Sequence, residues 1–123
     1  MLKELKTVLP AADLRRARRF YHDALDLDPD EVLDGLLVYK GPGSGFEIYE
    51  TENAGTAKNT QMSFITDDLA TEIVRLRARG VVFEDYDVPG MKTVDSVATT
   101  DEMKSAWFRD TEGNFICITE FLS

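Results

Sequence analysis

The same order of sequence patterns occurs twice along this chain. In each half, a short apolar or β-branched run leads to an aspartate-leucine pair, and that pair opens a helical pattern before further strand-like runs. Asp68-Leu69 stands 55 positions after Asp13-Leu14, whereas Ile116–Glu120 stands 70 positions after Phe46–Glu50. The 15-residue difference places extra chain in the region 87–103. A repeat that accounts for the whole chain constrains the fold more than any single motif does.

The first half predicts one helix and four strands. Asp13 is placed to cap a helix over 14–25, in which apolar side chains recur every three or four positions. Asp34-Gly35 is typical of a tight hairpin turn. Residues 51–59 are small and polar, which is typical of a linker. The predicted strands cover 5–9, where Pro10 closes the strand, and 31–33, 36–40 and 46–50.

The second half repeats this order. Asp67-Asp68-Leu69 opens a helix that buries Leu69, Ile73 and Leu76, and Gly80 is placed as its C-terminal cap. Asp110 and Asn114 lie in the last hairpin turn, where turn chemistry explains both residue types. The predicted strands cover 62–65, 81–83 with a continuation over 84–86 left open, 105–109 and 115–121.

These patterns predict an α+β fold of two βαβββ modules, with about eight strands and two helices. The whole chain, 1–123, is expected to form a single domain. Module 1 covers about 1–52, the linker about 53–59 and module 2 about 60–123. One helix covers only one face of its sheet, so each module keeps an open, concave face, which is a usual setting for a ligand.

Composition excludes several classes of protein. The chain is 43% hydrophobic and 30% charged, with a net charge of −9. No apolar run approaches the ~18 residues of a membrane span, and an acidic chain repels phosphate backbones, so neither membrane nor nucleic acid is an expected partner. The charged N-terminal residues argue against a signal peptide and favour a cytoplasmic location. The single cysteine, Cys117, excludes a disulfide framework within the chain.

Three segments resemble the vicinal oxygen chelate superfamily, which includes glyoxalase I, the bleomycin-resistance proteins and extradiol dioxygenases. They are Asp13–Leu27, Asp67–Val81 and Trp107–Asn114, of which the last, similar to F-x-D-P-D-G-N, is the most specific. The resemblance implies two βαβββ modules that form curved mixed sheets around a concave cavity. It also implies a homodimer.

The resemblance further implies four metal-ligand positions, on the first and fourth strands of each module. Here they fall on Lys6, Glu47, Gln61 and Cys117. Lys6 is an ammonium without a lone pair, and a zinc site without histidine is unusual. The chain's one histidine, His22, is expected on the solvent side of the first helix. We therefore predict no metal ligands and expect no cofactor, with a divalent metal kept as an alternative.

The function predicted from these features is metal-independent binding of a small molecule. Because side chains alternate along a strand, Tyr49 shares a face with Glu47, and Ser63 with Gln61. The predicted ligand-binding residues are Lys6, Glu47, Tyr49, Gln61, Ser63, Trp107 and Cys117.

Several alternatives remain open at the level of sequence. A glyoxalase-like lyase, isomerase or dioxygenase would use a divalent metal, or Glu47 as a general base with Lys6 stabilising negative charge. Lys6 and Glu47 are alternatively a pair that neutralises a lost metal site. Cys117 is predicted as a core or cavity-lining residue rather than a nucleophile. Tyr39 and Trp107 are each either a cavity wall or a core residue. The basic run 15–19 is either an anion-binding patch or a solvated helix face. The 87–103 loop is a lid, a binding loop or a dimer contact.

Overall fold

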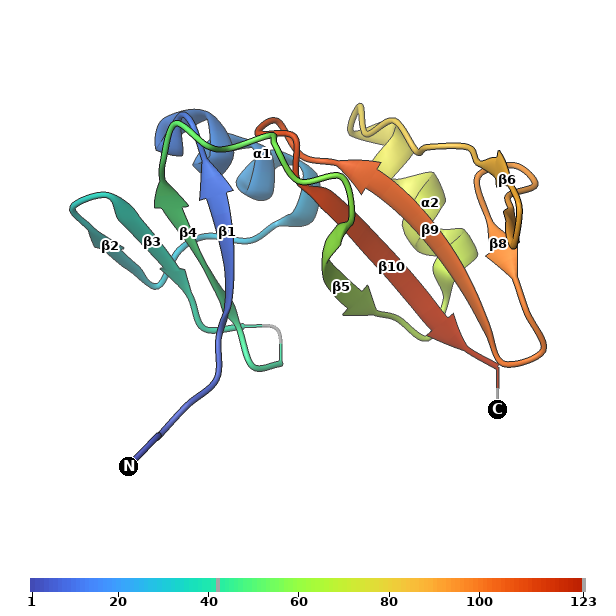
Figure 1. The fold of residues 1–123 in the computed structure, drawn as a ribbon, viewed down its shortest axis with the longest axis horizontal. Coiled ribbons are helices and arrows are strands. Elements are labelled where there is room, and N and C mark those ends of the chain that lie inside the picture. Colours follow the sequence, from blue (N-terminus) through green and yellow to red (C-terminus); the bar gives the residue numbers. More distant parts are fainter. Residues whose placement is uncertain (42, 123) are drawn as a thin grey trace. The chain divides into compact units, whose positions relative to one another are not determined.

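The computed structural model describes residues 1–41 and 43–122. The chain divides into two compact units, one formed by 1–58 with 110–114, and the other by 59–109 with the C-terminal strand from Phe115 onward. Each unit contains a four-stranded mixed sheet and one long helix (Figure 1). The predicted α+β arrangement of two βαβββ modules is confirmed.

The first unit contains a mixed sheet whose strands lie in the order β1-β4-β3-β2. Its elements are β1 (Thr7–Ala11), α1 (Leu14–Leu25), β2 (Glu31–Leu33), β3 (Leu36–Tyr39) and β4 (Phe46–Glu50). Strands β1 and β4 are parallel and the other neighbours are antiparallel. Asp13 caps α1 as predicted, because its Oδ1 accepts hydrogen bonds from the N–H groups of Arg15 and Arg16 at 3.0 and 3.1 Å.

The prediction that Pro10 closes the first strand is wrong. Strand β1 runs through Pro10 to Ala11, and Pro10 pairs in register with Tyr49 of β4. Because β1 is an edge strand, the ladder on its outer side needs no N–H donor, and proline is tolerated there.

The second unit repeats the first with the order β5-β10-β9-β8. Its repeated elements are β5 (Thr60–Ile65), α2 (Leu69–Ala78), β8 (Ala98–Thr99), β9 (Met103–Arg109) and β10 (Phe115–Phe121). Strands β5 and β10 are parallel, as β1 and β4 are, and β8 holds the place that β2 holds in the first unit. Gly80 follows α2 with a φ of 89°, as a glycine cap requires.

The extra residues of the second half form a separate small hairpin between α2 and β8. Strands β6 (Asp87–Val88) and β7 (Met91–Lys92) pair only with each other. The predicted strand over 81–83, with its open continuation over 84–86, is wrong, because only Phe83 forms a β-bridge there, to Phe108. The N–H of Tyr86 instead donates to Thr93 Oγ1 at 2.8 Å, so this N–H bonds within the loop and not to a neighbouring strand.

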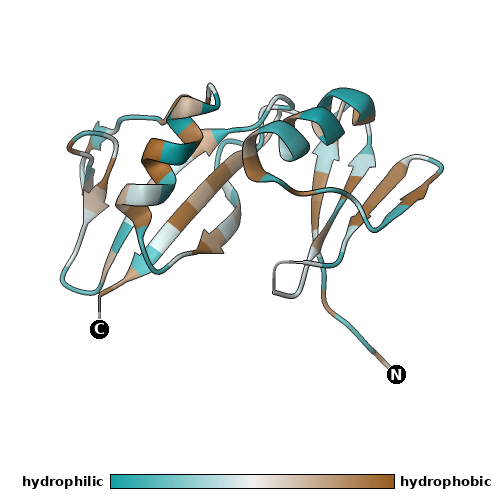
Figure 2. Ribbon diagram, turned by 180° about the vertical axis from the view of Figure 1, so that it is seen from behind, coloured by the Kyte–Doolittle hydropathy of each residue, from teal (hydrophilic) through white to brown (hydrophobic). Residues whose placement is uncertain are grey.

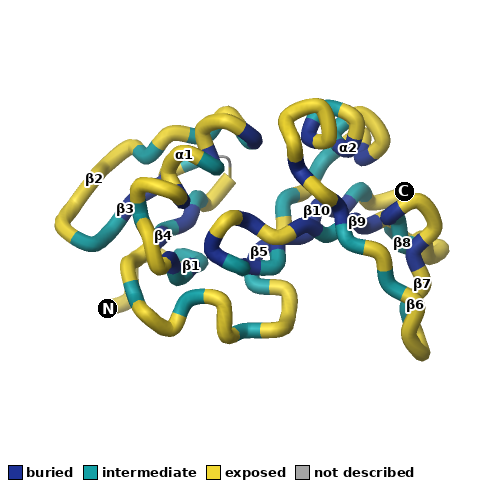
Figure 3. The backbone as a smooth tube through the Cα atoms, turned by 90° about the horizontal axis from the view of Figure 1, so that it is seen from above, coloured by how far each residue is buried: buried dark blue, intermediate teal, exposed yellow. Residues whose placement is uncertain are grey.

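Each sheet buries the face that its helix covers. In the first unit, Tyr21 of α1 packs against Tyr39 and Phe46, with ring centroids 6.0 and 5.5 Å apart. The rings of Tyr39 and Phe46 stack at 4.5 Å, so Tyr39 is a core residue and not a cavity wall. In the second unit, β10 is buried along most of its length (Figure 3).

The turn 110–114 belongs to the first unit and carries two buried carboxylates. Glu112 accepts hydrogen bonds from Arg16 Nε at 2.8 Å and Nη2 at 3.0 Å, and from the backbone N–H groups of Ala12 and Asp13, both at 3.0 Å. Asp110 accepts one from the Tyr21 hydroxyl at 2.7 Å and also bonds the backbone of its own turn. The two carboxylates therefore do more than shape a turn, because they bond the turn to α1 and the end of β1.

Glu112 is expected to make stability depend on pH. Burial acts to raise its pKa, but the hydrogen bonds from Arg16 and Asp13 outweigh burial, so the pKa lies below the ordinary 4.5. A carboxyl with a lowered folded pKa stabilises above its unfolded pKa and loses that contribution as the pH falls. The stability lost in Glu112→Gln should thus be largest at neutral pH and shrink below about pH 4.5. Urea unfolding of both proteins from pH 7 to pH 3 measures this, and a constant difference across the series would contradict it.

Candidate ligand site

The face of the first sheet opposite α1 carries the predicted residues of this unit. Paired residues of neighbouring strands point to the same side, so Glu47 of β4 shares this face with Val8 of β1 and Val38 of β3. Tyr49 lies one pair further along on the same face and is 42% exposed. Lys6 directly precedes β1 and has the same parity as Val8.

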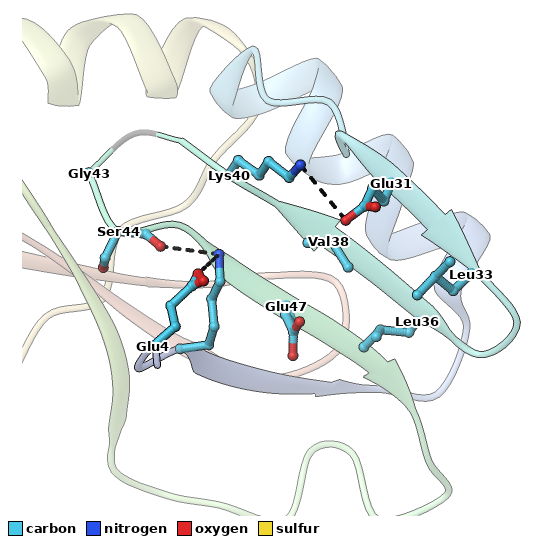
Figure 4. Close-up of a pocket in the computed structure, with 10 residues that line it drawn as sticks. Glu4, Glu31, Leu33, Leu36, Val38, Lys40, Gly43, Ser44 and Glu47 are labelled. Carbon is cyan, nitrogen blue, oxygen red and sulfur yellow. Dashed lines mark hydrogen bonds and ion pairs between the residues drawn. The ribbon is translucent and has the colours of Figure 1, made fainter. Parts of the chain in front are cut away.

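A groove of about 630 Å³ lies over this face (Figure 4). Its floor combines the apolar side chains of Leu36 and Val38 with the carboxylate of Glu47. The complete lining is Glu4, Lys6, Glu31, Leu33, Leu36, Val38, Lys40, Gly43, Ser44 and Glu47. Its volume falls in the range of small-molecule sites, about 300–1,000 Å³.

The lysines of the groove are each paired with a carboxylate other than Glu47. Lys6 Nζ lies 3.3 Å from Glu4 Oε1 and also donates to the carbonyl oxygen of Ser44 at 3.3 Å. Lys40 Nζ lies 4.0 Å from Glu31 Oε2. The structure therefore brings Lys6 and Glu47 into one groove, but the predicted neutralising pair between them is wrong.

Glu47 is half-buried on the groove floor. Its side chain makes no hydrogen bond or ion pair with any residue in 1–41 or 43–122, and no dashed line reaches it in Figure 4. The groove thus contains three carboxylates and two ammonium groups, of which Glu47 alone lacks a partner in the described chain.

Three of the predicted residues in the second unit share one face of its sheet. Cys117 pairs in register with Ser63 on β5 and with Trp107 on β9. Cys117 is 5% exposed, and its Sγ lies 3.4 Å from Thr119 Oγ1. The thiol is therefore a buried polar neighbour of Thr119, as the core or cavity-lining prediction requires.

The side chains of Trp107 and Gln61 each form a hydrogen bond within the second unit. Trp107 Nε1 donates to Thr60 Oγ1 at 3.0 Å, and the Tyr86 ring meets its ring edge-on at 5.7 Å. Gln61 Oε1 accepts a hydrogen bond from the Phe115 N–H at 3.0 Å, where the β5–β10 register shifts. Both side chains thus stabilise strand pairing.

Sequence reasoning missed the β2–β3 side of the groove. Glu31, Leu33 and Leu36 line it together with Lys40. The signal was present, because the Asp34-Gly35 turn fixes the register Leu33↔Leu36 and so places both residues on one face. Tyr86 was also missed, and it carries no comparable signal because it lies in an irregular segment.

Three of the four positions that correspond to metal ligands cannot serve as metal ligands in this structure or already bind other groups. Lys6 is a cation, Gln61 accepts a hydrogen bond from a backbone N–H, and Cys117 contacts Thr119. Glu47 is therefore the one of these four positions whose side chain is unpaired in the described chain. Within residues 1–41 and 43–122, no group of three His, Cys, Asp or Glu side chains is arranged to hold a metal ion. His22 is exposed on α1 as predicted, with Nδ1 2.7 Å from Asp28 Oδ1.

Residues 5–118 match the sequence model of the Glyoxalase/Bleomycin resistance protein/Dioxygenase superfamily. The chain belongs to this superfamily. No curated protein matches the chain. In the described part of this superfamily member, no helix is long and apolar enough to cross a membrane.

Several solved structures share this superfamily fold. VPC_CASS1 from the mobile metagenome of V. Pseudocholerae is 23% identical, with a TM-score of 0.67 and coverage of 100% of this chain and 98% of that one. The antibiotic binding protein TnmS3 from Streptomyces sp. CB03234 is 21% identical, with a TM-score of 0.65 and 99% of each chain covered. Lactoylglutathione lyase from Agrobacterium tumefaciens is 22% identical, with a TM-score of 0.70 and coverage of 96% and 92%. At these identities the likeness shows the fold alone.

Proposed function

We propose that this chain binds a small organic molecule in the groove over its first sheet. The observation that carries the proposal is the unpaired carboxylate of Glu47, which lies beside Leu36 and Val38 on the groove floor. A concave apolar surface with a few polar groups is the usual form of a small-molecule site. Membership of a superfamily that includes resistance proteins, and the shared fold of an antibiotic binding protein, support this choice.

The chemistry of the groove favours a ligand with an apolar body and a cationic or hydrogen-bond-donating group. Lys6 and Lys40 already have carboxylate partners, so an anionic ligand would have to displace Glu4 or Glu31. Glu47 accepts hydrogen bonds without any such exchange, and hydrogen bonds that involve a charged group are the stronger ones.

Binding is proposed to be independent of metal because the donor set does not fit a hard divalent cation. The ammonium of Lys6 repels a cation, and the amide oxygen of Gln61 is committed to the Phe115 N–H. Where a metal is required, a chelator abolishes ligand binding. We expect EDTA to leave ligand binding by this chain unchanged.

A thermal-shift screen with planar and amine-bearing compounds tests this function. Compounds that occupy the groove should raise the melting temperature of the unmodified chain, and Glu47→Gln should lose most of that rise because a charged acceptor is removed. Glu52→Gln is the matched control, since Glu52 is exposed and does not line the groove. Stabilisation by no compound, or equal stabilisation of the Glu47→Gln protein, would contradict the proposal.

A cytoplasmic homodimer is proposed for the intact protein. Val8 and Tyr49, on the open face of the first sheet but outside the groove lining, are 49% and 42% exposed. Burial of such side chains by a second chain is favourable at roughly 25 cal/mol per Å². Sedimentation equilibrium measures the state, and a monomer at high concentration would contradict the dimer.

A further inference from the structure

The outward face of α1 carries a row of cationic side chains. Arg15, Arg18, Arg19 and His22 follow the spacing that places residues on one helix face over two turns. Together with Asp28 they line a depression of about 380 Å³. In Figure 2, α1 is among the most hydrophilic parts of its unit.

Three of these side chains lack anionic partners. Arg16 is bound by Glu112, but the side chains of Arg15, Arg18 and Arg19 form no ion pair or hydrogen bond within the described chain. The carboxylates of Asp13 and Glu112 already occupy the N-terminal end of α1, so the charge left uncompensated is that of the arginines on the outward face. Like charges three and four positions apart destabilise a helix. The free protein therefore carries a repulsion on this face that a bound anion would relieve.

A buried hydroxyl adds an independent observation. The Tyr39 hydroxyl is buried and has no hydrogen-bond partner among residues 1–41 and 43–122. Tyr39 packs against Tyr21 on the inner side of α1, the helix that carries the arginine row. Buried polar groups without a partner are rare and call for a specific explanation. The hydroxyl is therefore a donor without an acceptor beneath α1, although it does not line the depression.

We propose that this arginine face is a binding site for a ligand that carries two adjacent phosphate groups. Guanidinium groups bind phosphate oxygens through two parallel hydrogen bonds, with more geometric specificity than an ammonium group has. Arg15 and Arg19, the outermost of the three arginines, are separated by about 6 Å along the helix axis at 1.5 Å per residue. A single phosphate spans only part of that length, whereas a diphosphate reaches all three arginines. Asp28 is held by His22 at 2.7 Å, which reduces its repulsion of such a ligand.

Calorimetric titration with inorganic pyrophosphate, in a phosphate-free buffer at low salt, tests the site. We expect one pyrophosphate per chain, bound more tightly than orthophosphate. The combined change Arg15→Gln, Arg18→Gln and Arg19→Gln should weaken binding at least about tenfold, because each lost charged hydrogen bond is worth about that factor. Exchanging the same three residues for lysine keeps the charge and should still weaken binding, because the planar fork is lost.

The matched control changes three exposed lysines elsewhere, Lys3→Gln, Lys58→Gln and Lys92→Gln, and alters the net charge equally. Retained pyrophosphate affinity in this control supports a site on α1. Equal weakening in both triple variants, or no pyrophosphate binding by the unmodified chain, would overturn the proposal. Circular dichroism establishes that the arginine variants are folded, which is expected because the substitutions remove repulsion and break no contact.

Discussion

Glu112→Ala is expected to lower the free energy of unfolding by about 3–5 kcal/mol, because it removes two backbone hydrogen bonds to a charged acceptor, each worth about 1.5–3 kcal/mol. The Glu112 side chain is fully buried, while Arg16 remains half exposed. Loss of the Glu112 carboxylate leaves the backbone N–H groups of Ala12 and Asp13 without their acceptor at the start of α1. The lost ion pair adds less, because the half-exposed Arg16 side chain stays hydrated.

Urea unfolding monitored by circular dichroism measures this loss. Glu52→Ala is the control, because Glu52 is exposed, and it should change stability by less than about 0.5 kcal/mol. Arg16→Ala combined with Glu112→Ala forms a double-mutant cycle that isolates the pair from the backbone hydrogen bonds. A loss below about 1 kcal/mol in Glu112→Ala would show that the turn 110–114 is not held by this carboxylate.

Gly45→Ala is expected to cost about 2–4 kcal/mol, from positive-φ strain and a backbone clash together. Gly45 has a φ of 74°, and a methyl group there would overlap the carbonyl oxygen of Tyr39. Relief requires the backbone to move at the start of β4, next to the Ser44 carbonyl that binds Lys6. The substitution should therefore also weaken ligand binding in the groove.

Gly43→Ala separates strain from the clash. Gly43 has a similar φ of 67°, but an added methyl group meets nothing within 4 Å. It should cost only about 1–2 kcal/mol, the price of the left-handed backbone conformation alone. Thermal or urea unfolding of both variants gives the comparison, and equal losses would mean that the Tyr39 carbonyl does not restrict this loop.

The elements with strong local signals were predictable from the sequence. Helix α1 begins after Asp13 and ends at Leu25 as predicted, since its cap and apolar spacing are both local features. The Asp34-Gly35 turn and its two strands were also predicted, because Gly35 supplies the positive φ that the turn requires. The repeat of the whole pattern also predicted that the second half has the same order of elements along the chain as the first, which it has.

Short and irregular elements were not predictable. Strands β6, β7 and β8 have two residues each, too few to show a period of two. The loop before β8 is shaped by Asp85, whose Oδ1 accepts hydrogen bonds from Ser96 N at 2.8 Å and Thr93 Oγ1 at 3.0 Å. Such tertiary contacts leave no periodic signal in the sequence.

The candidate site was predictable in part. Strand parity predicted that Tyr49 shares a face with Glu47, and the family resemblance placed Glu47 toward the cavity. In the structure both lie on the face opposite α1. The partner of Lys6 was not predictable, because it depends on Glu4 ahead of the strand and on a loop carbonyl 38 positions away. The roles of Glu112 and Asp110 were missed for the same reason, since they bond to α1 about a hundred positions earlier in the chain.

The most direct test of Glu47 as the anchor of the groove compares one amine ligand with its N-acetylated counterpart. Calorimetry gives four dissociation constants, for both compounds with the unmodified chain and with Glu47→Gln. The amine should bind the unmodified chain at least about tenfold more tightly than the acetylated compound, and this preference should vanish in Glu47→Gln. An amine preference of the same size in Glu47→Gln would contradict a ligand site built on this carboxylate.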